Sequence, residues 1–68
     1  MTTVDARGYS CPEPVIMTRK ALMSKEAEYT VLVDNTASRE NVTRYAEHQG
    51  YKVAVVEADG VYTLTLKK

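Results

Sequence analysis

The only cysteine of the chain, Cys11, is followed closely by its only two prolines, Pro12 and Pro14. Proline is favoured in the first turn of a helix because the N–H that it lacks has no intrahelical partner there. We therefore predict a helix whose first residue is Pro12 and whose N-cap is Cys11. A sulfur at that position would face the free N–H of Glu13 and the positive end of the helix dipole. Both favour the thiolate, the nucleophilic form of cysteine, so this segment predicts a reactive thiol.

Other roles for this cysteine are open. Free cysteine is among the most buried residue types, so Cys11 as a small structural side chain is the alternative to a functional thiol. A cysteine–histidine hydrolase is disfavoured, because the only histidine, His48, is distant in sequence and 68 residues leave little room for a substrate cleft. One cysteine and one histidine do not make a metal-ligand cluster, so we expect no metal and no cofactor.

Length and charge narrow the classes of function. Sixty-eight residues predict one domain, 1–68. Nine basic and nine acidic residues cancel, which favours no direct nucleic-acid binding. A lone thiol fits a reducing compartment, and no apolar run approaches the roughly 18 residues of a membrane span. We expect a cytoplasmic protein that does not bind membranes.

Hydrophobic patterning predicts six elements. In chain order these are a strand at 2–6, a helix at 12–25, a strand at 29–33, a helix after Ser38, and strands at 52–57 and 61–66. Ser38 is the predicted N-cap of the second helix, and Gly50 is predicted to stop it. Asp59-Gly60 predicts a two-residue hairpin turn that pairs Val55 with Leu64.

This order indicates an α+β fold. The strand–helix–strand units require right-handed crossovers, which place both helices on the same side of the sheet. The economical arrangement is a two-layer α/β sandwich in the order β-α-β-α-β-β, with a mixed four-stranded sheet and both helices on one face.

Two motifs resemble a known family. Asp5-Ala6-Arg7-Gly8, followed by Cys11-Pro12-Glu13-Pro14 and a helix that begins Val-Ile-Met-Thr-Arg-Lys, resembles the TusA/SirA/YedF sulfur-carrier family. The resemblance extends over nearly the whole chain, and it implies the same two-layer fold. Members carry a sulfane sulfur as a persulfide on their single cysteine. The resemblance therefore implies that Cys11 takes the persulfide, and that Pro12, Glu13 and Pro14 complete the motif.

The family also implies two partners, a sulfur donor similar to a cysteine desulfurase and a sulfur-acceptor protein. Three further residues are predicted to serve the site. Gly8 permits the turn that presents the cysteine, and Arg7 could contact an anionic sulfur group or a partner carboxylate. Arg19 lies between Ile16 and Met23, in an apolar strip that a partner could cover.

The second half of the chain favours one branch of the family. Asp34-Asn35-Thr36 stands where the tRNA-thiolation branch has Asp-Asp-Pro, and several later segments look more like the YedF branch. There the module is often the N-terminal part of a longer protein associated with selenium metabolism, so this chain is a candidate excised domain. A selenium carrier, and a regulatory module that docks a partner without turning over its thiol, are the alternative functions. The oligomeric state is not predicted.

Overall fold

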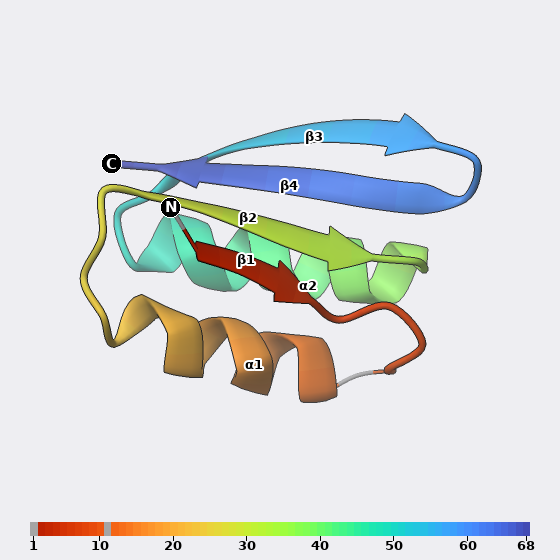
Figure 1. The fold of residues 1–68 in the computed structure, drawn as a ribbon, viewed down its shortest axis with the longest axis horizontal. Helices are drawn as coiled ribbons and strands as arrows, with labels where there is room; N and C mark the ends of the chain where they lie inside the picture. The colour runs from red at the N-terminus through yellow and green to blue at the C-terminus, as the bar shows by residue number, and fades with distance from the viewer. Residues whose placement is uncertain (1, 11) are drawn as a thin grey trace.

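The computed structural model describes residues 2–10 and 12–68, in which four strands and two helices follow the predicted order (Figure 1). They are β1 (Thr2–Asp5), α1 (Glu13–Leu22), β2 (Glu28–Val33), α2 (Thr36–His48), β3 (Lys52–Ala58) and β4 (Val61–Lys67). The strands form one sheet in the spatial order β1-β2-β4-β3. β1 pairs with β2 in parallel, and the other two pairings are antiparallel.

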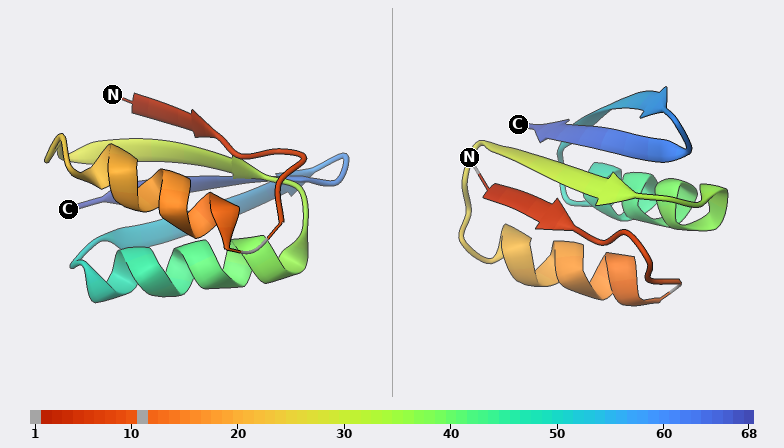
Figure 2. Two further views of the ribbon diagram at one scale, coloured as in Figure 1. Left: turned by 90° about the horizontal axis from the view of Figure 1, so that it is seen from below. Right: turned by 45° about the vertical axis from the view of Figure 1, so that its right-hand side comes forward.

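Both helices cover the same face of the sheet, and the opposite face has no helix over it (Figure 2). The predicted α+β sandwich with a mixed four-stranded sheet is therefore confirmed. Parallel pairing of β1 with β2 places the carboxyl ends of both strands at one edge of the sheet. The chain segments that leave these two ends build the region around residue 11.

The core lies between the sheet and the helices. Burial alternates along β2, where Tyr29, Val31 and Val33 face the helices and are inaccessible to solvent. This period of two is that of a strand with one covered face. The other fully buried apolar side chains are Ala6, Val42, Ala46, Leu64 and Leu66. These side chains connect α2, β2 and β4 into one cluster.

The β3–β4 hairpin has the predicted register. Val55 lies opposite Leu64, and the turn residues Asp59 and Gly60 have φ of 52° and 78°. Two successive positive φ angles define the type I′ turn that Asp-Gly favours. Val55 is nevertheless 42% exposed, because β3 is the edge strand and α2 covers it only in part.

The start of α2 and the end of α1 differ from the sequence predictions. The N-cap of α2 is Asn35, whose side-chain oxygen accepts the N–H of Ser38 at 2.8 Å. The predicted cap, Ser38, is instead a buried residue inside the helix. α1 ends at Leu22 rather than Lys25, whose φ of 54° is incompatible with a right-handed helix.

The C-terminus of α2 was predicted correctly. Gly50 donates its N–H to the carbonyl of Glu47, and Tyr51 donates to that of Ala46, both at 3.0 Å. This pair of bonds is a Schellman motif with Gly50 at the C′ position.

Candidate functional site

Cys11 lies outside the described residues, and the site is defined by the residues on either side of it. The N-cap of α1 is Pro12 and the helix begins at Glu13, so the prediction of Cys11 as the N-cap is wrong. The helix starts one residue later because Pro12 has φ −99° and ψ 9°, outside helical geometry. Its carbonyl already accepts an intrahelical bond, from the N–H of Ile16 at 3.1 Å.

The donor predicted to face the sulfur has another partner. Glu13 donates its N–H to the carbonyl of Ser10 at 3.0 Å. Pro12 and Pro14 have no N–H to offer. The prediction that the N–H of Glu13 is free is therefore wrong. Of the two features predicted to stabilise a thiolate, the N–H of Glu13 and the dipole of α1, only the dipole remains.

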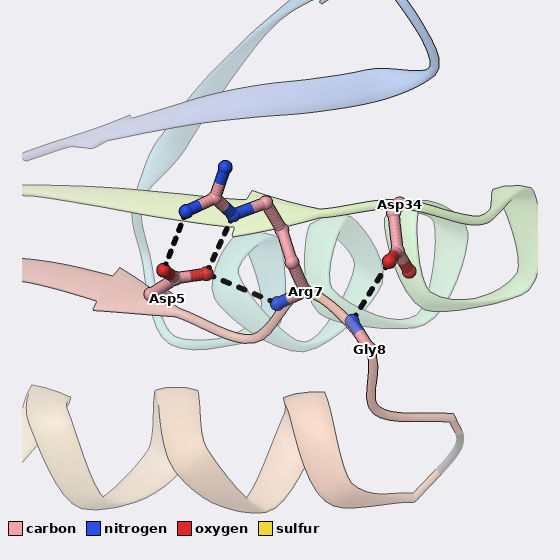
Figure 3. A network of polar contacts seen from close by, with 4 residues as sticks. All are labelled: Asp5, Arg7, Gly8 and Asp34. Carbon is pink, nitrogen blue, oxygen red and sulfur yellow. Dashed lines mark hydrogen bonds and ion pairs between the residues drawn. The ribbon is translucent and has the colours of Figure 1, made fainter.

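The loop before residue 11 is attached to the end of β2. Ala6 donates its N–H to the carbonyl of Leu32 at 2.8 Å, which extends the parallel pairing by one residue. Gly8 then turns the chain with φ +83°, a left-handed conformation that side chains with a Cβ rarely adopt. Its N–H donates to Oδ2 of Asp34 at 2.7 Å (Figure 3). The turn predicted at Gly8 is present, and a carboxylate from β2's C-terminal end holds it.

Asn35 makes a second attachment. Its side-chain NH₂ donates to the carbonyl of Tyr9 at 3.3 Å, while its side-chain oxygen caps α2. In the sequence, Asp34 and Asn35 were interpreted only as signs of the family branch, and neither contact was predicted. Their positions at the end of a strand parallel to β1 were the available signal, because parallel strands bring their carboxyl ends together.

Arg7 is held by Asp5. Its Nε and Nη2 lie 2.9 and 2.8 Å from the two carboxylate oxygens, and its backbone N–H donates to Oδ1 at 3.2 Å (Figure 3). These hydrogen bonds lower the pKa of Asp5 to about 2 and raise that of Arg7. Both side chains are half-exposed. A partner carboxylate would therefore have to compete with Asp5 for the guanidinium.

The remaining predicted site residues lie on α1. Pro14 is buried and its carbonyl accepts the hydroxyl of Thr18 at 2.8 Å, which gives it a structural role in the helix. Glu13 and Arg19 are exposed. Within residues 2–10 and 12–68, Arg19 has no carboxylate within 4 Å. Met23, at the end of the predicted apolar strip, is 77% exposed.

A groove opens between the start of α1 and the outer side of α2. Its volume is about 540 Å³, and its lining residues are Pro12, Val15, Asn41, Arg44, Tyr45, His48 and Gln49. The lining is mainly apolar, and no carboxylate contributes to it. The groove begins at the residue that follows Cys11 in the chain. The groove was not predicted from the sequence, in which His48 was considered only as a distant partner for the cysteine.

Among the described residues, no set of three or more His, Cys, Asp or Glu side chains is arranged to hold a metal ion. No helix in the same part of the chain has the length and apolarity needed to span a bilayer.

Comparison with known proteins agrees with these features. Residues 2–68 match the family model described as "Sulfurtransferase TusA". The chain belongs to the TusA family. It is 35% identical over 71 positions to the "Putative sulfur carrier protein MJ0990" of Methanocaldococcus jannaschii, covering all of this chain and 95% of that protein. The crystal structure of a SirA-like protein from Desulfitobacterium hafniense is 46% identical with a TM-score of 0.89, covering 98% of this chain and 96% of that one.

Membership of the TusA family supports a sulfur-carrier role. A sulfur carrier requires a protein that supplies the sulfur and a protein that takes it. The fold of the SirA-like relative is also that of this chain, with both helices on one face of the mixed sheet.

Proposed function

We propose that Cys11 accepts a sulfane sulfur as a persulfide from a donor similar to a cysteine desulfurase and relays it to an acceptor protein. The observation that supports this best is the geometry on both sides of the cysteine. Ser10 and Pro12 are both exposed, and the bond from Glu13 N–H to the Ser10 carbonyl spans the position between them. Exposed residues on both sides of position 11 support a thiol that a second protein can reach.

The chemistry is a thiol exchange. The Cys11 thiolate attacks the terminal sulfur of the donor's persulfide, forming a new S–S bond while the donor's S–S bond breaks. The donor cysteine leaves as a thiolate and takes up a proton. In the second step the acceptor's thiolate attacks the outer sulfur on Cys11, and Cys11 leaves as a thiolate. Neither step needs an external oxidant or reductant.

The surrounding residues would position this thiol. Gly8, held by Asp34, directs the chain away from β1, while Pro12 and Pro14 start α1. The α1 dipole favours a negative sulfur, and the exposed carboxylate of Glu13 in the first turn opposes it. Arg19 is an exposed cation available to an acidic partner surface, whereas Arg7 could contact one only in competition with Asp5.

The test is incubation with a purified cysteine desulfurase and free cysteine, followed by mass spectrometry of the intact chain. We expect a gain of one sulfur atom that Cys11→Ala abolishes and that a thiol reductant reverses. An unchanged mass together with retained desulfurase binding would overturn the relay and favour a docking module. The same assay with a selenide-derived donor tests the selenium prediction.

A further inference from the structure

The groove between α1 and α2 begins at the residue after Cys11, so it can contact a molecule that reacts with the cysteine. Pro12 forms one wall and is the residue directly after Cys11 in the sequence. Val15 and Tyr45, both half-buried, supply apolar surface from the two helices. Neither proline nor valine offers a side-chain hydrogen bond, so this part of the groove suits an apolar side chain.

The residues that line the groove include a cation, Arg44, and no carboxylate. Arg44 is exposed, and within the described residues it has no ion-pair partner inside 4 Å. His48, one turn further along α2, adds an imidazole to the same rim. Arg44 also lines a neighbouring hollow, together with Arg39, Glu40 and Glu47, so a partner carboxylate would compete there with those of Glu40 and Glu47. An arginine in this setting is suited to bind a carboxylate through two parallel hydrogen bonds.

We propose that this groove docks an extended segment of the sulfur-exchange partner, with an apolar side chain against Pro12, Val15 and Tyr45 and a carboxylate on Arg44. The inference rests on the proposed function for the identity of the partner, but the groove and its charge do not. Docking there would bring the partner's reactive sulfur to the residue adjoining Pro12. Specificity would follow from the guanidinium, because a partner segment with a cation at that position would be repelled.

The occupant is argued from charge complementarity. The chain as a whole is neutral, so no overall field attracts an acidic partner. The positive rim is local to a mainly apolar groove, which fits a mixed apolar and acidic segment better than a polyanion. A nucleic acid would instead require a basic stripe with aromatic faces for stacking.

Two small aromatic disulfides test the groove without any partner protein. The probes are 5,5′-dithiobis(2-nitrobenzoic acid), with a carboxylate on each ring, and 2,2′-dithiodipyridine, which carries no carboxylate. In each reaction the Cys11 thiolate attacks one probe sulfur, forms a mixed disulfide and releases one aryl thiolate. The ratio of the two second-order rate constants cancels changes in the nucleophilicity of the thiol.

Arg44→Glu should lower the ratio of the carboxylate probe to the uncharged probe by about tenfold, equivalent to about 1.4 kcal/mol. Arg44→Gln should lower it by about threefold. The matched control is Lys20→Glu, which makes the same change in charge at an exposed α1 residue outside the groove. It should change the ratio by less than twofold. Circular dichroism of each variant verifies that the fold is kept.

Three results would overturn the proposal: a ratio unchanged in Arg44→Glu, an equal fall in Lys20→Glu, or a dimer of this chain that Arg44→Glu dissociates.

With a persulfidated desulfurase as the probe, Arg44→Glu should raise KM about fivefold while the rate at saturation is kept. If no persulfide forms but the probe ratio still depends on Arg44, the proposed function fails and the groove stands. If persulfide forms with an unchanged KM and probe ratio, the groove alone fails.

Discussion

The backbone N–H of Gly8 donates to the carboxylate of Asp34 at 2.7 Å, which joins the loop after β1 to the end of β2 (Figure 3). The two residues are 26 positions apart, and the parallel pairing of β1 with β2 brings them together. Gly8 is in the left-handed region with φ +83°, which glycine adopts without the strain that a Cβ would bring. This contact sets the direction in which the chain approaches the cysteine.

Asp34→Ala should destabilise the protein by about 1.5 kcal/mol, since it removes a hydrogen bond to a charged acceptor. Chemical denaturation measures this change, and amide exchange at Gly8 should accelerate more than exchange at Val31 in the core. Asp34→Asn is the matched variant, because an amide oxygen can still accept the bond. A loss in Asp34→Asn as large as that in Asp34→Ala would show that the contact is not a hydrogen bond to this oxygen.

Asn35, and not Ser38 as the sequence pattern predicts, is the N-cap of α2. Asn35 caps α2, so Asn35→Ala should lower the free energy of unfolding by about 1 kcal/mol. Ser38 is fully buried, and its hydroxyl has no hydrogen-bond partner within the described part of the chain. Ser38→Ala should therefore be neutral or stabilising by up to about 1 kcal/mol, because an unpaired buried hydroxyl is unfavourable. Thermal denaturation of the two variants side by side is the measurement, and the opposite order would restore Ser38 as the cap.

The ion pair of Asp5 with Arg7 predicts a dependence on acid pH. Hydrogen bonds from Arg7 lower the pKa of Asp5 from its ordinary 3.8 to about 2. A depressed carboxyl pKa stabilises the folded state above the ordinary value, and this contribution is lost as the pH falls from about 3.8 through 2. The difference in stability between wild type and Arg7→Ala should accordingly shrink over that window. Carbon NMR of the carboxyl should show Asp5 titrating near 2 in the wild type and near 3.8 in the variant.

The features predicted correctly from sequence are those that depend on nearby residues. Hydrophobic period, the Asp59-Gly60 turn and the Gly50 stop are local signals, and they account for the element order and the β3–β4 register. The errors arose where tertiary placement chooses between adjacent candidates. Ser38 was predicted as the cap of α2, but Asn35, three residues earlier in the chain, takes that place. Asn35 is favoured because its side chain also contacts the Tyr9 carbonyl across the loop.

The candidate site was predictable as a motif but not as a geometry. The spacing of the glycine, cysteine and prolines indicates where the chemistry lies. It does not reveal that Ser10 takes the Glu13 donor, since that bond depends on how the loop folds back. Nor does it reveal that Arg44 and Pro12 border one groove, because no local pattern relates two residues that lie 32 positions apart.

Lys25 predicts a substitution that should stabilise the protein. Its φ of 54° lies in the left-handed region, which costs a residue with a Cβ about 1–2 kcal/mol. The conformation is imposed by neighbours, because the hydroxyl of Tyr29 contacts both the Ser24 hydroxyl and the Glu26 N–H at 2.8 Å. Lys25→Gly relieves the strain but adds up to about 1 kcal/mol of unfolded-chain entropy, which leaves a net gain of about 0.5 kcal/mol.

The matched control for Lys25→Gly is Lys20→Gly, an exposed lysine inside α1. Glycine there should destabilise by about 1 kcal/mol, because it loses helix propensity without relieving any strain. Urea denaturation of both variants should move the midpoints in opposite directions from the wild type. Equal destabilisation by the two substitutions would mean that the left-handed conformation of Lys25 stores no strain that glycine can relieve.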